Sequence, residues 1–155
     1  CVPVGEVLMG INIRQKGAIG ERQVADALNL IANRVLTAHG RPLPLKPLVQ
    51  RNQNQSAVGG SDLTNPFGLC IEVKRQENLS INTWWKQCLQ AKLEFGGLPI
   101  LIFKQNREKW RVIMMLHCPL VDAPYRAEMN WDDFQDWAER YLTINFLKGA
   151  WDNVA

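Results

Sequence analysis

The order in which helix and strand patterns follow one another limits the fold of this chain more than any other feature. Apolar residues recur at helical spacing in three segments, and strand-length apolar or alternating segments lie between them. The predicted elements are a helix over 16–34, strands over 48–51, 61–64 and 69–74, a helix from 80 or 82 to 95, strands over 98–104 and 109–116, and a helix over 131–143. This order predicts an α/β or α+β fold with a mixed central β-sheet flanked by helices.

The length of the chain favours one domain. A chain of 155 residues can bury one hydrophobic core, so we expect a single domain over 1–155, with an additional acidic C-terminal helix within 120–155. Met9 could be an in-frame start, which makes residues 1–9 a candidate N-terminal extension. The sequence has no apolar run of membrane-spanning length, no secretory signal pattern and no paired cysteine motif. We therefore expect a soluble, intracellular protein of the cytoplasm or nucleoid, without a membrane partner.

Charge is distributed unevenly along the chain. Up to Arg111 there are fifteen Lys and Arg residues against eight Asp and Glu, whereas from Val112 onward there are three against seven. The first two thirds are therefore basic and the tail is acidic. A basic main body suits a polyanionic partner such as nucleic acid, although ordinary surface charge is an equally good explanation of this feature alone.

Two charged residues lie within the predicted strand over 69–74. Because side chains alternate along a strand, Glu72 and Lys74 share a face opposite Ile71 and Val73. The tight connection after residue 64 predicts a hairpin, which brings Asp62 beside Glu72 if the register is regular. Burial of unpaired charge costs several kcal/mol, so these residues need compensation. An ion pair between Glu72 and Lys74 is the simplest form of it, and Asp62 alone would be read as a turn-flanking residue.

A third carboxylate lies on the first predicted helix. At 100° per residue, Glu21 falls in the middle of the apolar stripe formed by Val24, Leu28 and Ala32. A core-facing helix gains no stability from a carboxylate there. The alternative is that Glu21 belongs to the first helical turn, where a negative charge interacts favourably with the helix dipole.

Carboxylates that converge beside one lysine indicate a cation site. Asp and Glu oxygens without a set of His or Cys ligands favour Mg²⁺ or Mn²⁺ over zinc. Such an ion lowers the pKa of a water molecule and stabilises the negative charge that builds on a phosphate under attack. Lys74 would orient the attacking water or stabilise the phosphate oxygens. This combination predicts phosphodiester hydrolysis.

The same residues carry a family resemblance. Asp62, nine intervening residues and then Glu72-Val73-Lys74 resemble the signature of the PD-(D/E)xK nuclease superfamily. Lys16-Gly17 followed by Glu21, and downstream the segments 95–103 and 110–112, are similar to the archaeal-type Holliday junction resolvase branch. The resemblance covers roughly residues 14–116. One departure is that Ser61 stands where the superfamily usually has a proline before the aspartate.

The resemblance implies a restriction-endonuclease-like core, Mg²⁺ or Mn²⁺ as cofactor, and a homodimer that cuts branched DNA in recombination or repair. The implied catalytic residues are Glu21, Asp62, Glu72 and Lys74, and the implied metal ligands are Glu21, Asp62, Glu72 and the main-chain carbonyl of Val73. Arg14, Lys16, Arg51, Ser56 and Arg75 are the expected contacts to the DNA backbone. Gln87 is a candidate accessory residue of the site, although a surface position on an amphipathic helix is the more ordinary interpretation.

Three functions follow from these features. The leading hypothesis is a metal-dependent, structure-selective DNA endonuclease that acts on four-way junctions or other branched DNA. The alternatives are a restriction-type or repair-type nuclease on the same core, and a DNA-binding module without turnover. A phage-encoded protein is among the origins that fit.

Overall fold

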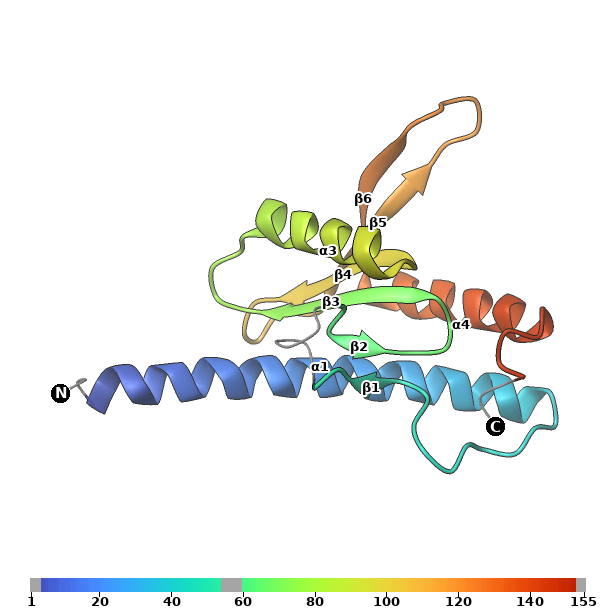
Figure 1. Cartoon of the computed structure of the whole chain (residues 1–155), viewed down its shortest axis with the longest axis horizontal. Coiled ribbons are helices and arrows are strands. Elements are labelled where there is room, and N and C mark those ends of the chain that lie inside the picture. The colour runs from blue at the N-terminus through green and yellow to red at the C-terminus, as the bar shows by residue number, and fades with distance from the viewer. Residues whose placement is uncertain (1–3, 54–59, 153–155) are drawn as a thin grey trace.

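The fold is a sheet with helices on both faces. A computed structural model describes residues 4–53 and 60–152 of the chain (Figure 1). The described elements are α1 (Val4–Ala38), β1 (Gln50–Arg51), β2 (Leu63–Thr64), β3 (Leu69–Arg75), α3 (Ile81–Phe95), β4 (Leu98–Lys104), β5 (Arg111–His117), β6 (Pro124–Asn130) and α4 (Trp131–Leu147).

The strands form one mixed sheet. Within the described residues its six strands lie in the order β1-β2-β3-β4-β5-β6. β3 and β4 are parallel and are connected through α3, whereas every other neighbouring pair is antiparallel. The predicted fold class, a mixed central sheet flanked by helices, is therefore confirmed.

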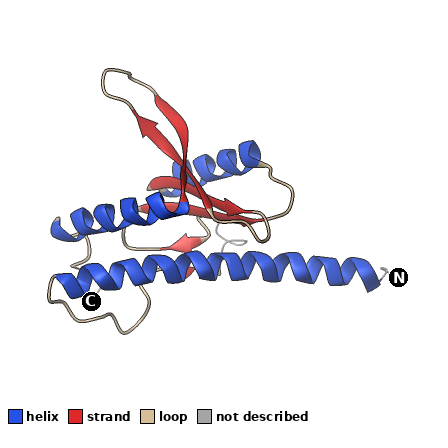
Figure 2. Cartoon of the chain, turned by 180° about the vertical axis from the view of Figure 1, so that it is seen from behind, coloured by secondary structure: helices blue, strands red, loops and turns tan. Residues whose placement is uncertain are grey.

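The helices divide the core into two parts. α1 and α4 cover one face of the sheet and α3 covers the other (Figure 1 and Figure 2). Ile71 and Val73 of β3 pack into the larger core cluster, together with residues of α1 and α4. Leu101 and Phe103 of β4 pack under Trp84 and the rest of the α3 side. Side chains of β3 that point away from Ile71 and Val73 therefore lie on the α3 side of the sheet.

The first helix is longer than the sequence pattern predicts. α1 extends from Val4 to Ala38, rather than over 16–34, so that residues 4–9 of the candidate extension continue the same helix. At the C-terminal end the cause is packing. Val35 and Leu36 are buried in the larger core cluster, and their burial stabilises a last turn that apolar spacing alone marks weakly.

Strand β6 is not predicted by the sequence, which indicated only a proline-containing link before α4. Its register with β5 runs continuously from Arg111 opposite Asn130 to His117 opposite Pro124. Most of its side chains are exposed, so the apolar alternation that marks a half-buried strand is absent. The β5–β6 hairpin projects from the body of the molecule (Figure 1). Its backbone hydrogen bonds to β5, rather than side-chain burial, make it a strand.

The third predicted helix matches α4 and packs inside the chain. Trp131, Phe134, Trp137 and Tyr141 form a series of stacked rings, with successive centroids 5.5, 5.8 and 5.0 Å apart. Phe134 is fully buried, and the hydroxyl of Tyr141 donates to the carbonyl of Phe67 at 2.8 Å. Asn130 caps the helix by accepting from the backbone N–H of Asp133. The aromatic stripe therefore fixes α4 against the larger core cluster.

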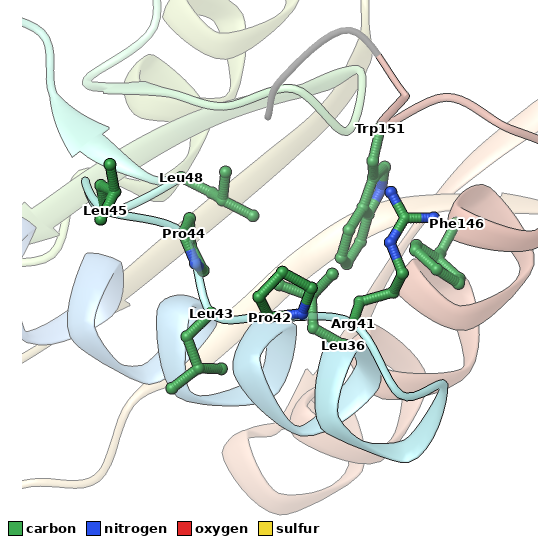
Figure 3. A pocket seen from close by; sticks show the side chains of 9 residues that line it. All are labelled: Leu36, Arg41, Pro42, Leu43, Pro44, Leu45, Leu48, Phe146 and Trp151. Atoms are coloured by element: carbon green, nitrogen blue, oxygen red, sulfur yellow. The ribbon is translucent and has the colours of Figure 1, made fainter.

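The proline-rich segment after α1 is an extended connector, as its prolines predict. It folds back beside the end of α1 and lines an apolar cavity of about 320 Å³, which Leu36, Phe146 and Trp151 complete (Figure 3). The Arg41 guanidinium lies 5.7 Å from the centroid of the Phe146 ring. No helix within the described ranges has both the length and the apolar character needed to cross a membrane.

Candidate active site

Glu72 and Lys74 lie on the α3 side of β3, as the alternation of the strand predicts. Glu72 is buried, with 6% of its surface exposed, and its Oε2 lies 3.5 Å from the Nζ of Lys74. Glu72 pairs in register with Leu101 of β4, so it stands in the middle of the sheet rather than at an edge. The sheet therefore holds a charged pair where a stability-driven sequence would place apolar residues.

Asp62 is fixed beside this pair by the β2–β3 hairpin. Its backbone N–H donates to the carbonyl of Ile71 at 2.9 Å, and its side-chain Oδ2 accepts from the backbone N–H of Val73 at 2.6 Å. Its carbonyl accepts from the N–H of Asn52 at 2.8 Å. Asp62 is 5% exposed. The expected register is confirmed, and the orientation of the Asp62 carboxylate is set by main-chain bonds on both sides.

Ionisation of Glu72 is unfavourable beside Asp62. Burial and then the negative charge of Asp62 raise the pKa of Glu72, the ammonium of Lys74 lowers it, and the resulting pKa is about 8. One lysine therefore does not neutralise the pair. A second positive charge between Asp62 and Glu72 would favour the ionised form of Glu72.

Glu21 approaches the same region from α1 but is bound to another residue. It follows Gly20, where an added Cβ would lie 3.2 Å from the Trp110 ring, so the small residue allows α1 to pass close to the sheet. The Nε of Arg51 donates to Oε2 of Glu21 at 2.6 Å. Burial raises the pKa of Glu21, the Arg51 hydrogen bond lowers it, and the charge of Asp62 raises it. Glu21 is thus within electrostatic reach of Asp62 while its carboxylate is held by Arg51.

Two of the three carboxylates expected as metal ligands, Asp62 and Glu72, lie next to each other. In residues 4–53 and 60–152, no three His, Cys, Asp or Glu side chains are grouped closely enough to hold a metal ion. Asp62 and Glu72 nevertheless fit a hard divalent cation, because they are adjacent carboxylates whose combined charge, once Glu72 is ionised, exceeds that of Lys74. The N–H and carbonyl of one strand residue point to the same side, so the Val73 carbonyl faces the side on which Val73 donates to Asp62.

The expected DNA-contacting residues occupy different positions. Arg14 and Lys16 are exposed on α1, and Arg75 donates through Nε to Oδ1 of Asn106 at 3.3 Å. Arg51 is partly buried against Glu21. Ser56 lies outside the described residues.

Gln87 shares an open cleft with Glu72. The cleft has a volume of about 450 Å³, and Lys86, Gln90 and Glu94 of α3 also line it. Sequence reasoning did not select Lys86, because helical spacing marks this residue only as exposed. It is recognised as part of the site only from the packing of α3 over β3.

The chain is similar to known proteins. Residues 12–153 match the sequence model of a family described as "Phage putative PDDEXK endonuclease". Protein D14 of Escherichia phage T5 is 29% identical over 132 residues, which cover 74% of this chain and 78% of that protein. Among solved structures, the chain aligns with Hjc of Archaeoglobus fulgidus, which is described as a Holliday junction resolvase from an archaeal hyperthermophile. The TM-score is 0.35, and the alignment has 16% identity over 57% of this chain and 80% of that one. The family match includes every residue of the candidate site.

Proposed function

Because this chain belongs to the phage family of PDDEXK endonucleases, we propose that it is a divalent-metal-dependent DNA endonuclease that hydrolyses phosphodiester bonds at the Asp62–Glu72–Lys74 cluster. The observation that carries the proposal is the placement of Glu72 beside Asp62 inside the sheet, with Lys74 as the neighbouring cation. A stable fold has no need of this arrangement, whereas hydrolysis of a phosphate diester uses each part of it.

Each side chain has a proposed role. Asp62, Glu72, the carbonyl of Val73 and Glu21 would hold Mg²⁺ or Mn²⁺, which supplies Lewis-acid stabilisation of charge on the scissile phosphate. Lys74, with its ammonium 3.5 Å from Glu72, donates hydrogen bonds to the attacking water or to a phosphate oxygen. The main-chain bonds of Asp62 hold its carboxylate in place, so little rearrangement precedes the reaction.

The substrate we propose is a four-way junction or another branched DNA. Arg14, Lys16 and Arg75 supply positive charge for the DNA backbone, and Gln87 is positioned to hydrogen-bond DNA from the cleft that contains Glu72. Paired cuts on two strands are produced most simply by two identical sites in a symmetric homodimer. The family and its phage T5 relative support a phage origin.

A cleavage assay tests the proposal. Four-way junction, nicked duplex and linear duplex are incubated with the protein and Mg²⁺, Mn²⁺ or EDTA. We expect metal-dependent cleavage that is lost in the folded variants Asp62→Asn, Glu72→Gln and Lys74→Ala. Glu94→Gln is the matched control, because Glu94 lines the same cleft but hydrogen-bonds Gln90 instead of the cluster.

The outcomes separate the proposed function from its alternatives. Preference for the junction supports a resolvase, and sequence-dependent cutting of linear duplex supports a restriction-type or repair-type nuclease. Salt-sensitive DNA binding without product in any metal would support a non-catalytic module. If the folded Glu72→Gln protein cuts as fast as the parent, the site assignment is wrong. Sedimentation that shows only monomer at working concentration would contradict the homodimer.

A further inference from the structure

We propose that Arg51 is a positioning residue that holds Glu21 away from the cation site in the DNA-free protein and releases it when a DNA backbone phosphate takes the guanidinium. The inference rests on the proposed function, because it treats Glu21 as a metal ligand. It adds a coupling between DNA binding and metal binding that runs through one ion pair.

The ion pair between Arg51 and Glu21 is short and sheltered. The Nε of Arg51 lies 2.6 Å from Oε2 of Glu21, and the two side chains are only 27% and 15% exposed. Charge-assisted hydrogen bonds of this kind are stronger than exposed ion pairs, which contribute little. By comparison, Arg140 and Asp136 form a pair on α4 whose side chains are 76% and 67% exposed.

Both partners are attached to the elements that build the site. The residue after Arg51 is Asn52, whose backbone N–H donates to the carbonyl of Asp62, and Arg51 itself is paired in register with Leu63. Glu21 belongs to the long helix α1. The position of Arg51 relative to Asp62 is therefore set by the β1–β2 ladder, and the orientation of the Glu21 side chain decides whether it reaches Arg51 or the carboxylates.

Arg51 and a divalent cation compete for the same carboxylate. The hydrogen bond from Arg51 to Oε2 fixes the orientation of the Glu21 carboxylate, so this bond has to loosen before Glu21 can turn toward Asp62 and Glu72. The charges of Asp62 and Lys74 already act on Glu21, and we expect it to reach the cation site by reorientation of its side chain. The DNA-free protein is then expected to bind a metal ion with Asp62, Glu72 and the Val73 carbonyl, and without Glu21.

Arg51 also faces the place where a phosphate can bind. It lines an open groove of about 550 Å³ between α1 and the start of the sheet, together with Arg22 and Lys46. The groove contains one carboxylate, Asp26, against three cationic side chains. A planar guanidinium pairs well with phosphate oxygens, so a DNA backbone in this groove competes directly with Glu21 for Arg51.

Competition of this kind makes the two binding events reciprocal. If DNA frees Glu21 for the cation, the cation must favour DNA binding by the same factor. Metal binding would thus be strengthened only after the substrate has entered the groove.

The first test measures Mn²⁺ binding by isothermal titration calorimetry in the absence of DNA. We expect Arg51→Gln to bind Mn²⁺ about tenfold or more tightly than the parent, on the scale of one charge-assisted hydrogen bond. In the Glu21→Gln background the same substitution should give no gain. Arg22→Gln is the control, since it removes a positive charge from the same groove and leaves the Arg51–Glu21 hydrogen bond in place, and it should change the affinity less than about twofold.

The second test measures DNA binding in EDTA, where no cleavage occurs, by fluorescence anisotropy of a labelled duplex. Glu21→Gln frees Arg51 and should tighten DNA binding by about tenfold, and the gain should vanish in the Glu21→Gln/Arg51→Gln double variant. Asp26→Asn is the control, because it removes a negative charge from the same groove but leaves the Arg51–Glu21 pair intact.

Either test can overturn the inference. Equal Mn²⁺ affinity of the parent and Arg51→Gln rules out the inference. A gain in Mn²⁺ affinity that persists in the Glu21→Gln background also rules it out, because that gain reflects only the removal of a positive charge. If Arg51→Gln does not fold, the anisotropy comparison of Glu21→Gln with Asp26→Asn decides the question, because equal effects of these two variants contradict a specific release of Arg51. A parent protein that cleaves DNA while failing these tests keeps the proposed function and loses only the coupling.

Discussion

Neutralising Glu72 should change how the stability of the metal-free protein depends on pH. Burial, followed by the charge of Asp62, raises the pKa of Glu72 from 4.5 to about 8. Between these two values the folded protein keeps a proton that the unfolded chain has released, so the free energy of unfolding falls as pH rises. Below the lower pKa Glu72 is protonated in both the folded and the unfolded protein, and above the higher pKa the loss of stability is complete.

The size of the effect follows from that pKa. Each pKa unit is worth about 1.4 kcal/mol, so ionisation of Glu72 lowers the free energy of unfolding by at most about 5 kcal/mol. Glutamine has a similar shape and no charge, so the Glu72→Gln protein does not lose stability through ionisation at this position as the pH rises from 4.5 to about 8. The interaction with Lys74 already contributes to that pKa, so we expect Glu72→Gln to be more stable than the parent by up to about 5 kcal/mol near pH 9 and to have almost no advantage near pH 4.5.

Urea unfolding followed by tryptophan fluorescence, in EDTA and at a series of pH values, measures this difference. The chain contains six tryptophans, so the signal is adequate. Glu94→Gln on exposed α3 surface is the control and should follow the parent at every pH. Added Mn²⁺ should stabilise the parent but not Glu72→Gln at high pH, since a ligand that binds only the folded state stabilises it. Parallel stability curves for the parent and Glu72→Gln from about pH 4.5 to pH 9 would refute the reasoning.

Two further substitutions test how α4 is held. Phe134→Ala should lower the free energy of unfolding by about 3–5 kcal/mol in urea titrations, because Phe134 is fully buried between α4 and the sheet. A loss below about 1 kcal/mol would show that the packing of Phe134 matters little. Tyr141→Phe removes the 2.8 Å hydrogen bond to the Phe67 carbonyl and should lower the free energy of unfolding by about 1 kcal/mol in the same assay. Unchanged stability would mean that water replaces the hydroxyl without penalty.

Several features were predictable from the sequence because they depend on local spacing. Alternation along β3 placed Glu72 and Lys74 on one face, and the short β2–β3 connection placed Asp62 beside them. The aromatic stripe of α4 follows from helical periodicity in the same way. Strand β6 was missed for the corresponding reason, since its exposed side chains carry no alternating apolar pattern and its pairing with β5 is made by the backbone.

The sequence by itself determined which face of its own element each carboxylate occupies, and it thereby determined that Asp62 and Glu72 meet. Only the tertiary structure decided what Glu21 binds, because Arg51 is 30 residues away along the chain and its approach depends on how α1 lies against the β1–β2 ladder. The packing of α3 over β3 likewise decided that Glu72 is buried, and burial is the largest cause of its raised pKa. Spacing along a chain sets the direction of a side chain, whereas the choice among charged partners depends on distances and solvent exclusion that arise only when separate elements pack together.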